Sequence, residues 1–311
     1  GNINVTAGSF SLRDGTKLEA STSGQGNAGN IDITTTGNLT ISGTQDSTLL
    51  QQPDGVARSK INSSTFGQGN AGKITINTGG KLSVLNKGGI LSEVRDTGVG
   101  NSNGIKIDAG ELEIANRSSI QTTTKQAKLV KDKGNAGNID IKTKGNLTIS
   151  GTENPTFLQE RAGVALSSIN SSTEGQGDAG KITIDTAGKL SVLNRGGIFS
   201  AIDATGVGNS NGIKIDAGEL DIANQSSIQT PTSQAKLVKD KGNAGDITIS
   251  TNGNLTIIGT NNSSDSGVSG INSSSVGAGD AGKVTINTQG NKLFLSNRAA
   301  IFSAIKEGVG N

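Results

Sequence analysis

The sequence repeats itself every 108 residues. The octapeptide Gly-Asn-Ala-Gly-Asn-Ile-Asp-Ile of residues 26–33 returns at 134–141, and a close copy returns at 242–249. A fixed period of this kind is typical of solenoids, in which each repeat packs on its neighbours and no single centre organises the fold. The repeat therefore predicts an elongated, stacked chain, and it directs the functional question to a long surface.

A smaller pattern occurs three times within each 108-residue block. Its first strand alternates apolar and polar residues, as in Ile31 and Ile33, and its second strand alternates in the same way seven or eight residues later, as in Leu39 and Ile41. A Gly-containing turn is expected between these two strands. Period-two alternation is typical of a strand with one buried face. The pattern therefore predicts short strands that send aliphatic side chains into a shared interior.

A third, weaker strand completes each unit. Its inward aliphatic residue is followed two residues later by Ala, Ser or Thr, and we expect the stacked interior hydroxyls to hydrogen-bond to one another. The inward aliphatic residues are Leu18, Ile61, Ile90, Ile120, Ile169, Ile198, Ile228, Ile271 and Ile301. One unit alone buries too little apolar surface to fold, because ordering each residue costs about 1–2 kcal/mol. Stacking of units is therefore required.

Nine repetitions of strand, turn, strand, turn and strand predict an all-β fold. We expect a right-handed parallel β-helix, or β-solenoid, of about nine three-strand coils, with a 108-residue super-repeat of three coils. Residues 1–311 are expected to form a single continuous segment of a longer repeat protein. Its complete super-repeats are 26–133 and 134–241, and its partial ones are about 1–25 and 242–311.

Composition excludes several functional classes. The chain has no His, Cys, Trp, Tyr or Met, and only 31% of its residues are hydrophobic and 2% aromatic. Its 28 basic and 26 acidic residues nearly cancel, so it lacks the basic surface by which proteins bind nucleic acid. No run approaches the roughly 18 apolar residues of a membrane span. We therefore expect no nucleic-acid partner, no membrane insertion of this segment and no cofactor.

Asparagine follows the second strand in most coils. It occurs at Asn86, Asn116, Asn194, Asn224 and Asn297. Because asparagine tolerates the left-handed backbone conformation and bonds locally, these residues predict a structural ladder at one corner of the solenoid. Gly43, Gly151 and Gly259 take the same place in every third coil, so the ladder is expected to be interrupted there.

Asp185 and Asp216 are the candidate metal-binding or catalytic residues, because we expect them to stack on adjacent coils. Such a pair can hold Ca²⁺ or serve as the two carboxylates of a glycosidase. The alternative interpretation is a pair of solvated carboxylates near Lys142 and Lys214. The lack of His, Tyr and Trp argues against catalysis, and we expect no enzyme activity.

Leu91, Phe199 and Phe302 form the candidate interaction surface. Alternation places them outward on the third strand, one in every third coil, at a spacing of about 14 Å along the stack. Regularly spaced exposed apolar residues can mark an interaction face, unless neighbouring loops cover them. Such loops are expected from insertions at 45–58, 153–166 and 261–268, and from a basic insertion at 126–133 that recurs at 234–241.

Several of the repeated segments resemble a known family. These segments are Gly-Asn-Ala-Gly-Asn-Ile-Asp-Ile (26–33), Gly-Asn-Leu-Thr-Ile-Ser-Gly (37–43), Gly-Asn-Ala-Gly-Lys-Ile-Thr-Ile-Asn (69–77) and Gly-Asp-Ala-Gly-Lys-Ile-Thr-Ile (177–184). They are similar to the repeat region of large filamentous-haemagglutinin-like exoproteins of the two-partner-secretion class, particularly the cyanobacterial type. The resemblance implies a right-handed β-helix that an outer-membrane secretion partner exports to the cell surface or the extracellular space.

The functional expectation follows from this resemblance and from the repeat. We expect a structural rod of a secreted or cell-surface fibrous adhesin, which extends or displays binding regions or forms extracellular fibres. Its expected partners are other copies of the fibre or surface glycans and receptors. The alternative from another class is a β-helix polysaccharide-active enzyme, either a lyase or a hydrolase.

Overall fold

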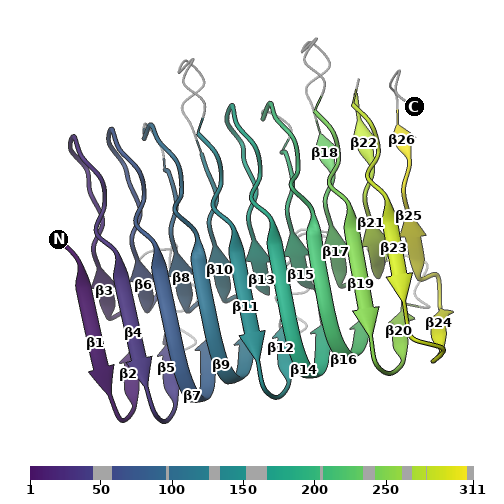
Figure 1. Ribbon diagram of the computed structural model, residues 1–311, viewed down its shortest axis with the longest axis horizontal. Coiled ribbons are helices and arrows are strands. Elements are labelled where there is room, and N and C mark those ends of the chain that lie inside the picture. Colours follow the sequence, from purple (N-terminus) through teal and green to yellow (C-terminus); the bar gives the residue numbers. More distant parts are fainter. Residues whose placement is uncertain are drawn as a thin grey trace.

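The computed structural model confirms the all-β solenoid. It describes residues 1–44, 58–95, 98–125, 134–151, 167–203, 206–233, 242–260, 268–277 and 279–306. Within these ranges the regular elements are β-strands, and no helix is present. The coils stack along one axis from the N-terminal to the C-terminal end (Figure 1). The expected insertions at 45–58, 126–133, 153–166, 234–241 and 261–268 lie almost wholly outside the described residues.

The largest sheet has 14 strands and combines the first and second strands of the coils. Its main path is β1 (Ile3–Ala7), β4 (Ile31–Thr35), β7 (Ile74–Leu85), β9 (Ile105–Ala115), β11 (Ile139–Thr143), β14 (Ile182–Leu193), β16 (Ile213–Ala223), β19 (Ile247–Thr251) and β23 (Val284–Asn287). The separate second strands are β2 (Phe10–Arg13), β5 (Leu39–Ser42), β12 (Leu147–Ser150), β20 (Leu255–Ile258) and β24 (Leu293–Ser296).

Two smaller sheets complete the coils. The 9-stranded sheet contains the third strands β3 (Lys17–Glu19), β6 (Lys60–Asn62), β8 (Gly89–Leu91), β10 (Ser119–Gln121), β13 (Ser167–Asn170), β15 (Gly196–Phe199), β17 (Ser227–Gln229), β21 (Gly270–Asn272) and β25 (Ala300–Phe302). The 3-stranded sheet contains β18 (Thr232–Ser233), β22 (Ser275–Val276) and β26 (Ile305–Lys306).

Each strand pairs in parallel with its equivalents in the adjacent coils. Ile31 is opposite Ile74, and Ile74 is opposite Ile105, so inward residues stack on inward residues. In Figure 1 the front strands run down the page, the strands behind them run up, and the coils advance from left to right, which makes the winding right-handed. This is the sense expected for parallel strand connections.

The expected turn between the first and second strands is absent from four coils. There, β7, β9, β14 and β16 continue through the corner as single long strands. Ile74 and Leu82 are eight residues apart whereas Ile105 and Leu112 are seven apart, so one extra residue must be accommodated. The register between β7 and β9 accordingly shifts at this corner, as it does between β14 and β16. A one-residue irregularity of this kind bends a strand without ending it.

Stacking produces a continuous aliphatic core. The coil of β7 and β8 contributes Ile74, Ile76, Leu82, Val84 and Ile90, and all five side chains are 0% exposed. Full burial of one such side chain is worth about 1.5–3 kcal/mol. The aliphatic residues that were predicted to point inward from the third strand are fully buried from Ile61 to Ile271, and those of the terminal coils, Leu18 and Ile301, are partly buried.

The hydroxyls two residues after the inward aliphatic residue of the third strand bond to backbone carbonyls, and not to one another along the stack as expected. Ser92 Oγ donates to the carbonyl oxygen of Gly72 at 2.7 Å, and Ser171 Oγ donates to that of Gly137 at 2.7 Å. Their equivalents from Ser63 to Ser303 also donate to glycine carbonyls. Each acceptor is the second glycine of a Gly-Asn-Ala-Gly or Gly-Asp-Ala-Gly turn, and a buried carbonyl requires a hydrogen-bond partner. This need selects the glycine carbonyl over a neighbouring hydroxyl.

Candidate functional site

The asparagines after the second strand adopt the left-handed conformation, with φ between 52° and 56°. They are Asn86, Asn116, Asn194, Asn224 and Asn297. Asn116 Nδ2 donates to Asn86 Oδ1 at 3.1 Å, and Asn224 Nδ2 donates to Asn194 Oδ1 at 2.8 Å. Asn86 and Asn194 in turn donate to Ser42 and Ser150 of the preceding coils. This corner holds coils together, and its side chains bond within the protein.

A second ladder, which the sequence analysis missed, runs beside the first sheet. Its members are Asn27, Asn70, Asn101, Asn135, Asp178, Asn209, Asn243 and Asp280. The side-chain oxygen of each member but the last accepts a hydrogen bond of 2.8–3.0 Å from the backbone N–H of the next. The sequence signal was available, because an Asn or Asp precedes the Ala-Gly or Ser-Asn pair in each of these coils.

The outward apolar residues of the third strand do not form a uniform exposed row. Leu91 is only 9% exposed, Phe199 is half-buried and Phe302 is 47% exposed. Leu91 lies between Asn62 and Gln121 of the adjacent strands. The expectation of an exposed side chain is therefore wrong for Leu91, which is covered. Phe302, the one strongly exposed member of the candidate surface, belongs to the last described coil.

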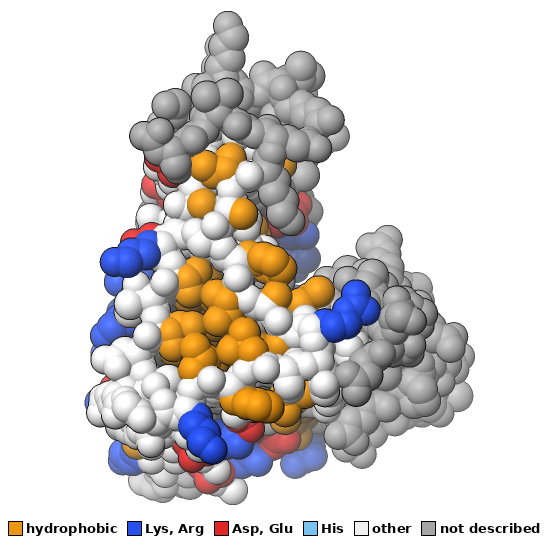
Figure 2. All heavy atoms as spheres, turned by 90° about the vertical axis from the view of Figure 1, so that its right-hand side faces the viewer, with side chains coloured by type: hydrophobic (Ala, Val, Ile, Leu, Met, Phe, Trp, Pro, Cys, Tyr) orange, Lys and Arg blue, Asp and Glu red, His pale blue; other side chains and the backbone are white. Residues whose placement is uncertain are grey.

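An exposed apolar patch lies at that end of the stack. Figure 2 shows apolar side chains gathered on the end face, and Leu293, Phe294, Leu295 and Phe302 are 39–52% exposed. Leu293 pairs in register with Leu255, which is 0% exposed. The exposure of Leu293 thus arises because no further coil of the described residues packs on this face.

Asp185 and Asp216 are brought together as expected, but each faces a lysine. They are register partners on β14 and β16. Lys142 Nζ lies 3.4 Å from Asp185 Oδ2, and Lys214 Nζ lies 2.7 Å from Asp216 Oδ2. The hydrogen bond and charge of Asp216 raise the pKa of Lys214. Among the described residues no group of three or more acidic, His or Cys side chains is arranged to hold a metal ion.

The carboxylates Glu174 and Asp203 form a second pair, whose environment is more unusual than that of Asp185 and Asp216. Lys125, Glu174 and Asp203 follow one another at the same corner of successive coils, and Lys125 Nζ lies 3.1 Å from Glu174 Oε1. Asp203 reaches the surface, yet the protein atoms packed around its carboxyl group and the charge of Glu174 raise its pKa to about 6. Alternation of strands does not reveal this pair, because both residues lie beyond the third strand.

Glu93 is a buried carboxylate, 4% exposed. It accepts a 2.6 Å hydrogen bond from Thr123 Oγ1, and Arg95 Nε lies 3.6 Å from its other oxygen. The Arg95 guanidinium also lies 5.7 Å from the centroid of the Phe66 ring. Burial raises the pKa of Glu93, and the Thr123 hydrogen bond and the Arg95 charge oppose this rise. The folded state therefore holds the Glu93 proton more tightly than the unfolded chain does.

Glu93→Gln is expected to become more stable than the wild type as the pH rises. Because the folded pKa lies above the unfolded value, the stability that Glu93 contributes is complete below about pH 4 and decreases as the pH rises through the folded pKa. Gln keeps the acceptor for Thr123 and carries no charge. Urea unfolding at about pH 4 and about pH 8 measures the change.

The control for this prediction is Glu113→Gln, which removes a carboxylate that is one-third exposed and paired with Lys81. Loss of stability by Glu93→Gln at about pH 8 would show instead that the ionised carboxylate is held favourably by Arg95.

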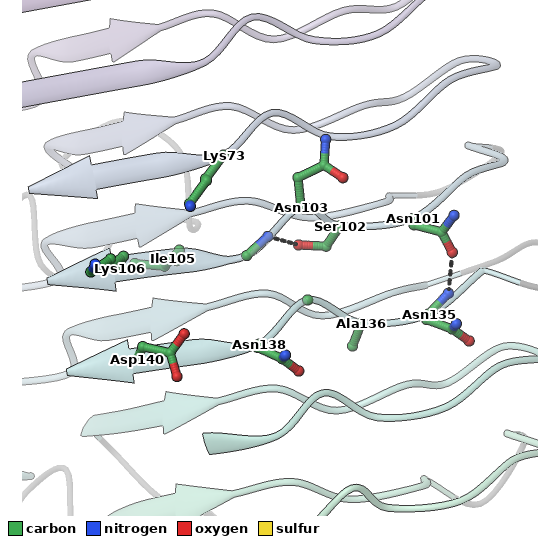
Figure 3. A pocket seen from close by; sticks show the side chains of 12 residues that line it. Lys73, Asn101, Ser102, Asn103, Ile105, Lys106, Asn135, Ala136, Asn138 and Asp140 are labelled. Carbon is green, nitrogen blue, oxygen red and sulfur yellow. Dashed lines mark hydrogen bonds between the residues drawn. The ribbon is translucent and has the colours of Figure 1, made fainter. Parts of the chain in front are cut away.

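A notch of 470 Å³ opens on the outer surface before β9 and β11. We define it by Lys73, Asn101, Asn103, Gly104, Lys106, Asn138 and Asp140. In the preceding coil, Lys73 stands immediately before the first strand, and Gly104 occupies this position in the notch coil. The hollow lies between this coil and its neighbours (Figure 3).

Local backbone geometry explains the glycine. Gly104 has φ +86°, and a Cβ there would lie 2.6 Å from the carbonyl oxygen of Asn138. Ser102 turns inward, where its Oγ lies 3.0 Å from Ser92 Oγ and accepts from the Gly104 N–H. The segment Asn-Ser-Asn-Gly thus forms the floor of the notch with backbone atoms.

The rim of the notch is polar. Lys73, Asn101, Asn103, Lys106, Asn138 and Asp140 are all exposed, and Figure 3 shows the Lys73 side chain extending toward the coil of Ile105. Lys106 and Asp140 are register partners, but they form no ion pair. Neither Lys73 nor Lys106 pairs with an acidic group within the described residues.

Comparison with family models, with curated proteins and with solved structures found no match to this chain. A search of the described part of the chain for a helix of the length and apolarity that a bilayer requires found none.

Proposed function

We propose that this chain is a structural rod of a secreted or cell-surface fibrous adhesin, which extends binding regions from the cell or contributes to extracellular fibres. The extracellular location, the outer-membrane secretion partner and the adhesin class come from the resemblance of the Gly-Asn-Ala-Gly-containing repeats to filamentous-haemagglutinin-like exoproteins. The partners of the rod are other copies of the fibre or surface glycans.

The unbroken pairing of coils is the observation that carries the proposal. From β1 to β23 each first strand is hydrogen-bonded to its neighbours in the stack, and the ladder from Asn27 to Asp280 continues alongside without a break. Sheets of this continuity resist bending and stretching, because separation of two coils breaks several backbone hydrogen bonds at once. A rod that serves as a spacer needs this resistance to bending and stretching.

We expect the rod to lengthen by one fixed step when a super-repeat is added. Insertion of a second copy of residues 134–241 after residue 241 should increase the maximum dimension in solution scattering by about 14 Å, since three coils each add about 4.8 Å. The cross-section should stay unchanged. A particle that widens instead would contradict a rod. The extracellular part of the proposal fails separately if antibodies against the chain label source cells only after permeabilisation.

One observation favours the enzyme alternative. Asp203, with a pKa raised to about 6, lies one coil from Glu174, which is held by Lys125. Two carboxyl groups on adjacent coils, one of them with a raised pKa, are the kind of pair that general acid and base catalysis of glycan cleavage uses. Release of reducing ends from an acidic polysaccharide by the wild type, abolished in Asp203→Asn, would favour a hydrolase over the rod.

A further inference from the structure

We propose that the notch at Gly104 and its repeat at Gly212 bind the acidic groups of a polysaccharide, with one carboxylate or sulfate in each notch. The inference rests on the proposed function for the presence of glycans around the rod. It goes further in naming the site, the ligand chemistry and the spacing.

Electrostatics favours an anion in the first notch. Lys73 and Lys106 approach it from two adjacent coils, and neither ammonium group is neutralised by an acidic side chain of the described residues. Cations that already have a protein partner gain little from a ligand, whereas unpaired ones gain a charge-assisted hydrogen bond. Lys73 and Lys106 are therefore the groups available to a carboxylate or sulfate.

The remaining lining favours a sugar over a simple anion. Asn101, Asn103 and Asn138 offer amide donors and acceptors along the rim, and Asp140 offers an acceptor for hydroxyl groups at one end. The hollow of 470 Å³ is larger than one carboxylate needs. Apart from Ile105 and Ala136 its lining is polar or glycine, in contrast to the mostly apolar lining of small-molecule pockets. A ring that carries several hydroxyls and one acidic group matches this lining in polarity and charge.

The local structure of the notch recurs once per super-repeat. Asn-Ser-Asn-Gly returns at 209–212, where Gly212 has φ +83° and a Cβ would lie 2.5 Å from the carbonyl oxygen of Asp246. Ser210 Oγ lies 3.0 Å from Ser200 Oγ, as Ser102 does from Ser92. The tight backbone contact and positive φ disfavour a side chain at both glycines.

The charges of the second notch differ in detail. Lys181 takes the place of Lys73 and, like it, has no acidic partner among the described residues, while Lys214 is held by Asp216. Asp246 and Thr248 stand where Asn138 and Asp140 stand in the first notch. Each notch thus keeps one lysine before the glycine coil and a single carboxylate on the far side.

Two sites on one rigid face allow a polymeric ligand to bind more tightly than a monomeric one. The notches are three coils apart, or about 14 Å, so a polysaccharide lying along the rod can occupy both at once. Binding at the second site is then intramolecular, and the combined affinity exceeds that of one site by about tenfold or more. A monosaccharide loses this gain.

Binding of the full chain to polygalacturonate, dextran sulfate and neutral dextran at low salt tests the proposal by calorimetry. The wild type should bind one or both polyanions, and should bind neither neutral dextran nor monomeric galacturonate with comparable affinity. The variant Lys73→Gln, Lys106→Gln, Lys181→Gln should bind at least about tenfold more weakly. The two polyanions distinguish a carboxylate from a sulfate ligand.

A matched control removes the same charge elsewhere on the same sheet. Lys81→Gln, Lys142→Gln, Lys189→Gln eliminates three lysines that pair with Glu113, Asp185 and Asp221. This control should bind like the wild type, and both variants should keep the wild-type circular dichroism. Equal loss in the two triple variants, or no binding of either polyanion by the wild type, would overturn the notch proposal. The rod proposal would survive either result, because solution scattering tests it independently.

Discussion

Gly180→Ala is expected to lower the free energy of unfolding by about 3 kcal/mol or more. A Cβ at Gly180 would overlap the carbonyl oxygen of Gly137 in the preceding coil and the hydroxyl of Ser171. Neither can move away freely, because Ser171 Oγ donates to this same Gly137 carbonyl in the closed interior. Overpacking and the loss of a buried hydrogen bond therefore act together. Urea unfolding followed by circular dichroism measures the change.

Gly24→Ala is the control for this prediction. A Cβ at Gly24 would meet nothing within 4 Å, and its φ lies in the ordinary range. Its substitution should change stability by less than about 0.5 kcal/mol. If Gly24→Ala were as damaging as Gly180→Ala, the cost would come from the change of residue type, and close approach of the coils would not be its cause.

Leu147→Ala is expected to destabilise the chain by about 3 kcal/mol, within the usual range of 2–5 kcal/mol for deletion of a buried aliphatic side chain. Leu147 is 0% exposed and lies between Leu112 and Leu190 of the adjacent coils. The cavity would be enclosed on both sides by regular sheet, which cannot collapse without breaking register. Urea unfolding at neutral pH again gives the magnitude.

Leu293→Ala tests whether stacking is the origin of this stability. Leu293 takes the same place in its coil as Leu147, but it is 46% exposed, and within the described residues its strand pairs on one side only, with Leu255 as its register partner. We expect its substitution to cost less than about 1 kcal/mol. Equal costs at the two positions would mean that each coil stabilises itself, against the one-dimensional stacking described above.

Strand alternation predicted the core well, for a physical reason. In a coil such as Ile74 to Ile90, each inward position recurs with its neighbours in the adjacent coils, so the same periodicity is repeated many times. Period two within a strand leaves only one face that suits aliphatic residues. The inward residues and the parallel register therefore followed from the sequence.

The candidate site was less predictable. Asn-Ser-Asn-Gly at 101–104 is visible in the sequence, but the notch also depends on Lys73 and Asp140, which come from the coils before and after. Leu91 has the alternation of an exposed residue, yet its surroundings cover it. Strand periodicity indicates on which face of the sheet a side chain lies. It does not indicate which residues pack over that face.

The sequence by itself determined the architecture of this protein: parallel coils, an aliphatic interior and left-handed corners at asparagine such as Asn116. These features depend on local or periodic residue patterns, and the same patterns recur in each repeat. Only the tertiary structure decided which coils bend without a turn, why Ser171 bonds to Gly137, and where a hollow lined by Gly104 and two lysines opens between coils. Those features arise between coils, where residues about 30 to 45 positions apart meet at the sheet spacing of about 4.8 Å.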